Sequence, residues 1–191
     1  MATPSGLSPQ KQFRLTLGLV LGVSLLFGLI VLPRLDPGGS GLEGQQAPDF
    51  ALPVIHGGDA GARIRLSNLS GQVVVLDFWA SWCRACLQQI PILGRVATRN
   101  HEGVIVVGVN SNDSPDGARG LLARLNPPYA SVEDESGTVS DAYGVSGLPT
   151  LVVIDSTGRI SAVRTGLVSE DELVELVASA RGADDRQRLE Q

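Results

Sequence analysis

An uncharged apolar run, residues 15–32, stands near the start of the chain. As an α-helix rising about 1.5 Å per residue, it would span roughly 27 Å, close to the hydrocarbon thickness of a bilayer. A core helix of a globular domain would have a polar face, and this run has none. Lys11 and Arg14 precede the run and Pro33 follows it, so the positive-inside rule places the N-terminus in the cytoplasm. We therefore expect a cytoplasmic segment over 1–14, a transmembrane signal-anchor helix over 15–32, and everything downstream on the extracytoplasmic side.

A cleaved signal peptide is the alternative interpretation of the same run. Its apolar region would be about 7–15 residues long and followed by a small-residue cleavage site. This run is longer, and only Gly39 and Gly41 offer a weak site after it. Both interpretations place the rest of the chain outside the cytoplasm. Residues 33–46, rich in glycine and proline, then predict a flexible tether.

From residue 47 to about residue 180, short apolar runs alternate with segments of helical period, which predicts a single folded domain. The expected strands are a short extended segment at 47–54, an edge strand at 63–66, and strands at 72–79, 104–109, 150–154 and 160–164. The expected helices are 83–99 with a kink at Pro91, one capped by Ser114-Pro115, a short one at 138–143, and one opened by the capping box Ser169-x-x-Glu172. The order predicts an α/β domain with a central mixed sheet and helices on both faces. The polar stretch 181–191 predicts a frayed tail.

The charge and the cysteine count narrow the function. A net charge of −5 without a basic patch argues against nucleic acid as a partner. The two cysteines are too few for a secreted disulfide scaffold. A structural zinc site needs four ligands, and His56 and His101 do not have a matching spacing. Leu87 stands where a haem-attachment motif requires histidine. We therefore expect no metal and no cofactor, and a redox role for the cysteine pair.

Cys83 and Cys86 lie where a predicted strand passes into a predicted helix. Free backbone N–H groups and the helix dipole at that position favour a thiolate, which is the attacking species in thiol chemistry. Arg84 adds a nearby positive charge. Cys86 lies one helical turn further on the same face and could resolve a mixed disulfide formed at Cys83. The alternative is a pair of buried structural cysteines.

Two further residues are candidates for the same chemistry. Asp77 lies on the strand before Cys83 and between apolar neighbours, so burial should raise its pKa and allow it to exchange a proton with Cys86. The alternative is an aspartate at a strand end that faces solvent. Pro149 precedes a strand and cannot donate to its hydrogen-bond ladder. For this residue the alternative is an ordinary loop proline with a trans bond.

Residues 77–86, which read Asp-Phe-Trp-Ala-Ser-Trp-Cys-Arg-Ala-Cys with Pro91 five positions later, resemble the active-site segment of thioredoxin. The Ala-Pro-Asp-Phe of 47–50 and the Tyr-Gly-Val-Ser-Gly-Leu-Pro-Thr that begins the motif at 143–158 resemble the TlpA/ResA branch of extracytoplasmic, membrane-anchored thioredoxin-like proteins. The match covers about residues 45–180. It implies a thioredoxin-like fold.

The resemblance also implies roles for the site residues. Cys83 would be the exposed nucleophile and Cys86 the buried resolving thiol, and Pro149 would be cis and face the pair. Trp82, Arg84 and Leu148 would contact the substrate.

The function that the resemblance implies is reduction of protein disulfides outside the cytoplasm. The substrates would be disulfide-containing proteins, apocytochrome c among them, and a membrane thiol reductase would supply the electrons. The alternatives are a disulfide oxidase or isomerase, and a binding or assembly module without redox turnover. Peroxiredoxins share the Ala-Pro-Asp-Phe segment, but their Thr-x-x-Cys site is absent, which argues against peroxidase activity. The chain departs from the branch at Gln89 in place of glutamate, at Asp77 in place of asparagine, and in the dipeptide Arg84-Ala85, which lacks proline.

Overall fold

The computed structural model describes residue 10 and residues 18–20, 22–24, 41–59, 61–99 and 103–189, the last seven of these by their backbone alone. The chain divides into two units, residues 1–37 and residues 38–191. In the first unit, residues 18–20 and 22–24 are helical, and the rest of the predicted anchor helix lies outside the described residues. Most of the predicted tether lies outside them as well. Among the described residues, no helix combines the length and the hydropathy that crossing a membrane requires.

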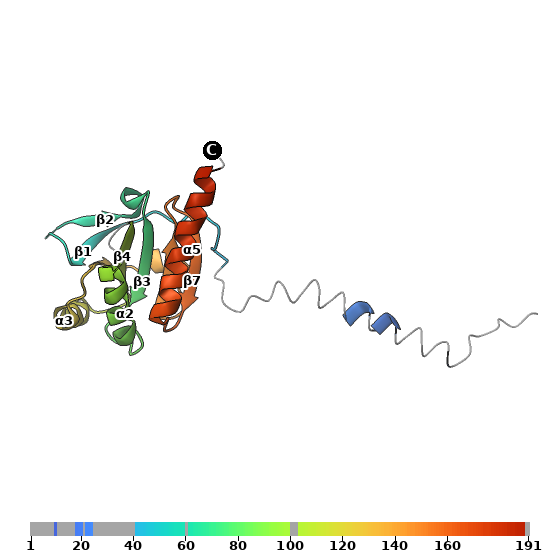
Figure 1. Ribbon diagram of the computed structural model, residues 1–191. Coiled ribbons are helices and arrows are strands. Elements are labelled where there is room, and N and C mark those ends of the chain that lie inside the picture. Colours follow the sequence, from blue (N-terminus) through green and yellow to red (C-terminus); the bar gives the residue numbers. More distant parts are fainter. Residues whose placement is uncertain are drawn as a thin grey trace, which may run out of the picture. The chain divides into compact units, whose positions relative to one another are not determined.

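The second unit is built on one mixed sheet (Figure 1). Its seven strands lie in the order β2-β1-β5-β4-β3-β6-β7. Strands β3, β4 and β5 are parallel, and every other pairing is antiparallel. The strands are β1 (Ala51–His56), β2 (Arg63–Arg65), β3 (Val73–Trp79), β4 (Val104–Ser111), β5 (Ala130–Asp134), β6 (Thr150–Ile154) and β7 (Ile160–Thr165). The mixed central sheet predicted from the sequence is confirmed.

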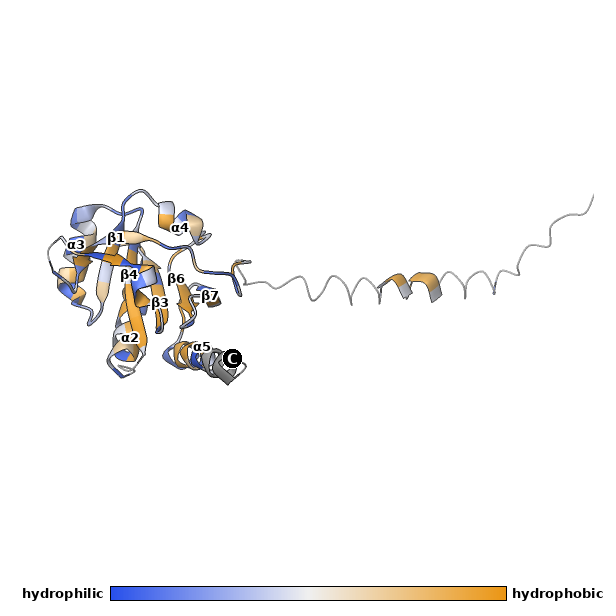
Figure 2. Cartoon of the chain, turned by 90° about the horizontal axis from the view of Figure 1, so that it is seen from above, coloured by the Kyte–Doolittle hydropathy of each residue, from blue (hydrophilic) through white to orange (hydrophobic). Residues whose placement is uncertain are grey.

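Helices cover both faces of this sheet. They are α2 (Cys86–Arg99), α3 (Pro115–Leu125), α4 (Thr138–Ala142) and α5 (Glu170–Leu189), with a 3₁₀ turn η2 (Leu66–Leu69). The successive crossovers from β3 to β4 and from β4 to β5 run in one direction across the sheet, so right-handed connections place α2 and α3 on the same face. Figure 2 shows α2 and α5 on one side of the sheet and α4 on the other.

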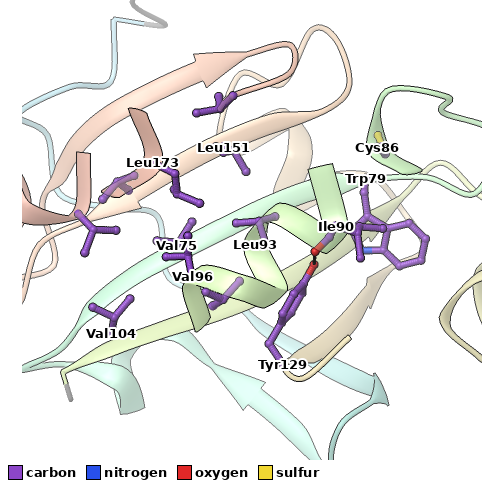
Figure 3. Close-up of a cluster of buried hydrophobic side chains, with 14 of the residues drawn as sticks. Val75, Trp79, Cys86, Ile90, Leu93, Val96, Val104, Tyr129, Leu151 and Leu173 are labelled. Carbon is purple, nitrogen blue, oxygen red and sulfur yellow. Dashed lines mark hydrogen bonds between the residues drawn. The ribbon is translucent and has the colours of Figure 1, made fainter. Parts of the chain in front are cut away.

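Strand β3 forms the centre of the core, because all seven of its residues are buried. Successive side chains point to opposite faces, so Val73, Val75 and Trp79 join the hydrophobic cluster under α2 and α5. Val74, Leu76 and Phe78 join the opposite cluster. Figure 3 shows the first cluster, in which Val75 and Trp79 of the sheet meet Ile90 and Leu93 of α2. By the same alternation, the Asp77 side chain lies on the α2 face of the sheet.

Several predicted boundaries differ from the structure. Helix α2 begins at Cys86 and not at Cys83, because residues 84 and 85 form a turn before it. Strand β5 was not predicted, and β1 pairs with it inside the sheet. Helix α5 continues to Leu189, past the predicted domain end near residue 180, since its polar residues are good helix formers. The two predicted caps are confirmed: the backbone N–H of the third helical residue donates to Ser114 in α3 and to Ser169 in α5.

The sheet leaves no room for a side chain at Gly108 of β4. A Cβ atom there would lie 2.5 Å from Ser131 Oγ and 2.9 Å from Trp79 Nε1. We expect Gly108→Ala to lower the free energy of unfolding by about 1–3 kcal/mol, measured by urea denaturation. Gly120→Ala is the control, because nothing lies within 4 Å of a Cβ at this exposed α3 position. Alanine there should stabilise the helix by up to about 1 kcal/mol, and equal effects of the two variants would contradict this account of the packing.

Candidate active site

The two cysteines form a disulfide at the junction between β3 and α2. The Sγ atoms are 2.09 Å apart and the Cα atoms 5.3 Å apart. Cys83 retains 6% of its surface exposed, while Cys86 is fully buried. Of the two cysteines, only Cys83 therefore keeps some contact with solvent. The pair belongs to the buried cluster that Figure 3 draws, where Cys86 lies above Trp79 and Ile90.

Cys83 makes cap-like hydrogen bonds to the start of α2 although it lies three residues before the helix begins. Its carbonyl accepts from Leu87 N at 3.4 Å, and the Cys86 backbone N–H donates to Cys83 Sγ at 3.1 Å. An N–H group at a helix start that already points at sulfur would stabilise a thiolate there once the disulfide is reduced. Arg84 is exposed on the same turn, so its charge acts through solvent.

Asp77, on the strand that leads to this junction, is fully buried. Neither carboxyl oxygen has a hydrogen-bond partner among the described residues. Burial raises the pKa of Asp77 to about 8, so the group is mostly protonated at neutral pH. The predicted burial and raised pKa are confirmed, and the alternative of a solvent-facing aspartate is wrong. A carboxyl group with a pKa in this range can accept a proton from a thiol or return one near neutral pH.

The Leu148–Pro149 peptide bond is cis, as the family resemblance implies. The Pro149 carbonyl accepts from Gly166 N at 2.8 Å, which ties this loop to the segment before α5. Leu148 is half-buried and packs against both core clusters. Trp82, by contrast, is 65% exposed beside the cysteines. Of the predicted substrate contacts, Trp82 and Arg84 are thus exposed and Leu148 is half-buried.

No cluster of three or more histidine, cysteine, aspartate or glutamate side chains that could hold a metal ion occurs in the part of the chain that the structure describes.

A sequence model of the AhpC/TSA family matches residues 43–163. The chain belongs to the AhpC/TSA family. Within that family its relatives are thiol–disulfide oxidoreductases of the TlpA/ResA-like group. The thiol:disulfide interchange protein DsbE of Allochromatium vinosum is 34% identical over 90% of this chain and 96% of its own length. The thiol-disulfide oxidoreductase ResA of Bacillus subtilis is 34% identical over 67% of this chain and 70% of its own length.

A solved structure agrees with these relatives. A Chlorobium tepidum crystal structure described as a thiol:disulfide interchange protein DsbE superimposes with a TM-score of 0.66 at 33% identity, covering 72% of this chain and 96% of its own. The thioredoxin-like fold and the enzyme class that the motifs implied are thus confirmed. This AhpC/TSA-family chain is a thiol–disulfide oxidoreductase.

Gln89 lies one helical turn after Cys86 and connects this site to a distant segment. Its side chain is fully buried, and Oε1 accepts from Val168 N at 2.8 Å. The amide nitrogen Nε2 has no partner among the described residues. The contact holds the segment before α5 against the helix that begins at Cys86. The sequence singled out Gln89 as a departure from the TlpA/ResA-like group, but gave no sign of its partner.

Three further residues near the site, Tyr129, Asn112 and Asp113, were not identified from the sequence. Tyr129 of the α3–β5 connection is buried, and burial together with the charge of Asp77 raises the pKa of its hydroxyl. Figure 3 shows the bond from this hydroxyl to the Ile90 carbonyl, 3.5 Å long. Asn112 and Asp113, which follow β4, contact the turn before Cys83. Asn112 and Asp113 could have been found from their position in the sequence. Residues that directly follow a strand parallel to β3 must lie at the same edge of the sheet as the cysteines.

Proposed function

We propose that the protein reduces disulfide bonds of other proteins on the extracytoplasmic side of the membrane. The chain is a thiol–disulfide oxidoreductase, and the observation that most supports the proposal is that its two cysteines are unequally buried. Cys83 is 6% exposed, and Cys86 is not exposed at all. A substrate sulfur can approach only the first of these. The cysteine that a substrate reaches is the one that forms the mixed disulfide, and its buried neighbour then completes the exchange.

The reaction has two exchange steps. The Cys83 thiolate attacks one sulfur of the substrate disulfide, a Cys83–substrate disulfide forms, and the other substrate sulfur leaves as a thiolate. Cys86 then gives its proton to the ionised Asp77 carboxylate and attacks Cys83 Sγ. The Cys83–Cys86 disulfide forms and the second substrate thiolate leaves. Two electrons have passed to the substrate, and a second reductant must restore the dithiol.

Trp82, Arg84 and Leu148 form the surface that the substrate contacts, with Pro149 beside the cysteine pair. Residues 15–32 anchor the protein as a single transmembrane helix with residues 1–14 in the cytoplasm. Residues 33–40 are the tether and the catalytic domain follows it, since residues 41–46 already bond to Ile160 of β7 and α5 continues to Leu189. The reductant is a membrane thiol reductase that passes electrons across the bilayer. The TlpA/ResA resemblance extends the substrates to apocytochrome c.

The reduction potential of the domain from Gly41 onward, equilibrated against glutathione, tests the direction of this reaction. We expect a value near or below about −250 mV, in the range of thioredoxin, because a reductant must hold its disulfide form more firmly than its substrates do. The Arg84-Ala85 dipeptide lies between the cysteines and influences this value. A potential of about −120 to −180 mV would instead identify an oxidase or isomerase and would contradict the reductase assignment, leaving the roles of both cysteines intact.

A further inference from the structure

The turn that carries Trp82 and Cys83 has little internal support. Residues 80–85 lie between β3 and α2 without regular secondary structure, and the Cys83 N–H donates back to the Ala80 carbonyl at 3.1 Å. Two further contacts reach this turn from the connection between β4 and α3. Because β4 pairs with β3 in parallel as far as Trp79 and Asn110, both strands deliver their following residues to the same edge of the sheet.

Asp113 is the centre of that connection. Its Oδ2 accepts from Ser81 N at 2.5 Å and from Asn110 Nδ2 at 2.9 Å. Its Oδ1 accepts from Ser81 Oγ at 2.7 Å and from Ser114 N at 2.8 Å. A carboxylate has about four acceptor sites, so all of them are used. Burial opposes ionisation of Asp113, yet the hydrogen bonds from Asn110, Ser81 and Ser114 outweigh it and hold the pKa below its ordinary value.

The residue before Asp113 holds the tryptophan. The Trp82 indole Nε1 donates to the Asn112 carbonyl at 3.0 Å, while 65% of the side chain stays exposed. Asn112 has a left-handed backbone with φ of 52°, a conformation that asparagine adopts more readily than other non-glycine residues. The Trp82 indole is thus held at its Nε1 edge by a hydrogen bond, while most of its surface is exposed to solvent.

Capping of α3 does not account for Asp113. Ser114 already caps that helix by accepting from Gly117 N at 3.1 Å, and Pro115 has no N–H to satisfy. The first turn of α3 instead lies against the cysteine turn: a Cβ at Gly117 would come within 2.5 Å of Ser81 Oγ. The network therefore joins two connections of the sheet and is directed at the residues beside Cys83.

We propose that Asp113 is a positioning residue for thiol exchange, which fixes the Ser81–Trp82 turn so that the indole forms a rigid docking face for a protein substrate beside Cys83. The inference rests on the proposed function, since docking matters only if the substrate is a protein. A ring that is held in place before binding contributes contact area without the entropy cost of ordering it. Removal of Asp113 should therefore slow reactions with protein disulfides more than reactions with small ones.

The test compares two substrates on the reduced full-length protein in detergent micelles. The second-order rate constants for insulin and for a small aromatic disulfide are measured for the wild type, Asp113→Ala and Asp116→Ala. Asp116 is the matched control, because this exposed α3 carboxylate pairs with Arg119 in the same helix. We expect Asp113→Ala to slow insulin reduction about tenfold and the small disulfide less than about twofold, and Asp116→Ala to change neither.

A second variant separates positioning from general support of the fold. In a Trp82→Ala background, Asp113→Ala should have no further effect on insulin reduction, because the face that it positions is absent. Acrylamide quenching of tryptophan fluorescence reports on the exposed Trp82, since Trp79 is buried, and should increase in Asp113→Ala and, less strongly, in Asp113→Asn. Equal slowing with both substrates, no slowing with either, or an undiminished effect in the Trp82→Ala background would overturn the proposal. If the wild type itself reduces the small disulfide but not insulin, the proposed function fails instead.

Discussion

Replacing Cys83 with serine should reduce the rate of disulfide reduction to that of the uncatalysed reaction, whereas replacing Cys86 with serine should stop the reaction one step later. Of the two cysteines only Cys83 keeps contact with solvent, and a hydroxyl cannot replace the thiolate that attacks the substrate. In Cys86→Ser the first attack proceeds, but no second thiolate is present to release the substrate. The mixed disulfide should then accumulate toward one substrate molecule per chain, measured by non-reducing electrophoresis and intact mass.

The two variants control for each other, because each retains one cysteine in the same turn. Cys83→Ser should form no adduct, since its remaining thiol is fully buried in the core cluster. The double variant should form none either. An adduct on Cys86 in the Cys83→Ser protein, or equal adduct yields from both single variants, would show that the order of attack proposed above is reversed or absent.

The parts of the fold that the sequence predicted well are those where the local pattern and the burial agree. Strands β3, β4 and β6 are buried on both faces and each contains a run of at least four mostly β-branched apolar residues, which identifies a central strand without any tertiary information. Strand β5 reads Ala-Ser-Val-Glu-Asp, which predicts a polar loop. Its Asp134 is nevertheless buried, because it accepts hydrogen bonds from Ser111 and from Ser140 and Val139 at the start of α4. Those partners lie on other elements, and the local sequence gives no sign of them.

The candidate site divides in the same way. Cys83, Cys86 and Asp77 lie within ten consecutive residues, so a strand followed by a helix fixes their arrangement, and the burial of Cys86 and Asp77 could be predicted. Cys83, expected to be exposed, retains only 6% exposure because it packs in the same core cluster. Gln89 and Asp113 act through contacts with Val168 and Ser81, which are 79 and 32 positions away. Only the register of the sheet and the packing of α2 against α5 bring these pairs together. The residues proposed to perform the chemistry were therefore predictable, and those proposed to hold them in place were not.

Replacing Asp77 with asparagine should make the protein more stable, by a margin that grows with pH. The pKa of Asp77 is about 8 in the folded protein against an ordinary value of 3.8, so between these values the folded chain keeps a proton that the unfolded chain has lost. With respect to Asp77, the free energy of unfolding of the wild type is therefore highest below about pH 4. It falls by roughly 1 kcal/mol per pH unit up to about pH 8. Asparagine does not titrate, so this loss is absent from the variant. Urea unfolding of both proteins at several pH values should give equal stabilities near pH 4 and a difference of several kcal/mol near pH 8.

The same substitution should slow the reaction although it stabilises the fold. The opposite signs of the two effects separate the role of Asp77 in the reaction from its effect on stability. Without a carboxylate to accept the Cys86 proton, release of the mixed disulfide should be about a hundredfold slower in single-turnover reduction of insulin. Asp134→Asn is the control, because this equally buried carboxylate has four hydrogen bonds, and weakening them should lower stability at every pH. A stability difference that does not vary with pH would mean that Asp77 does not retain its proton on folding. An unchanged rate of release would mean that another group deprotonates Cys86, and the unpaired carboxyl beneath the cysteines would then lack a role in the reaction.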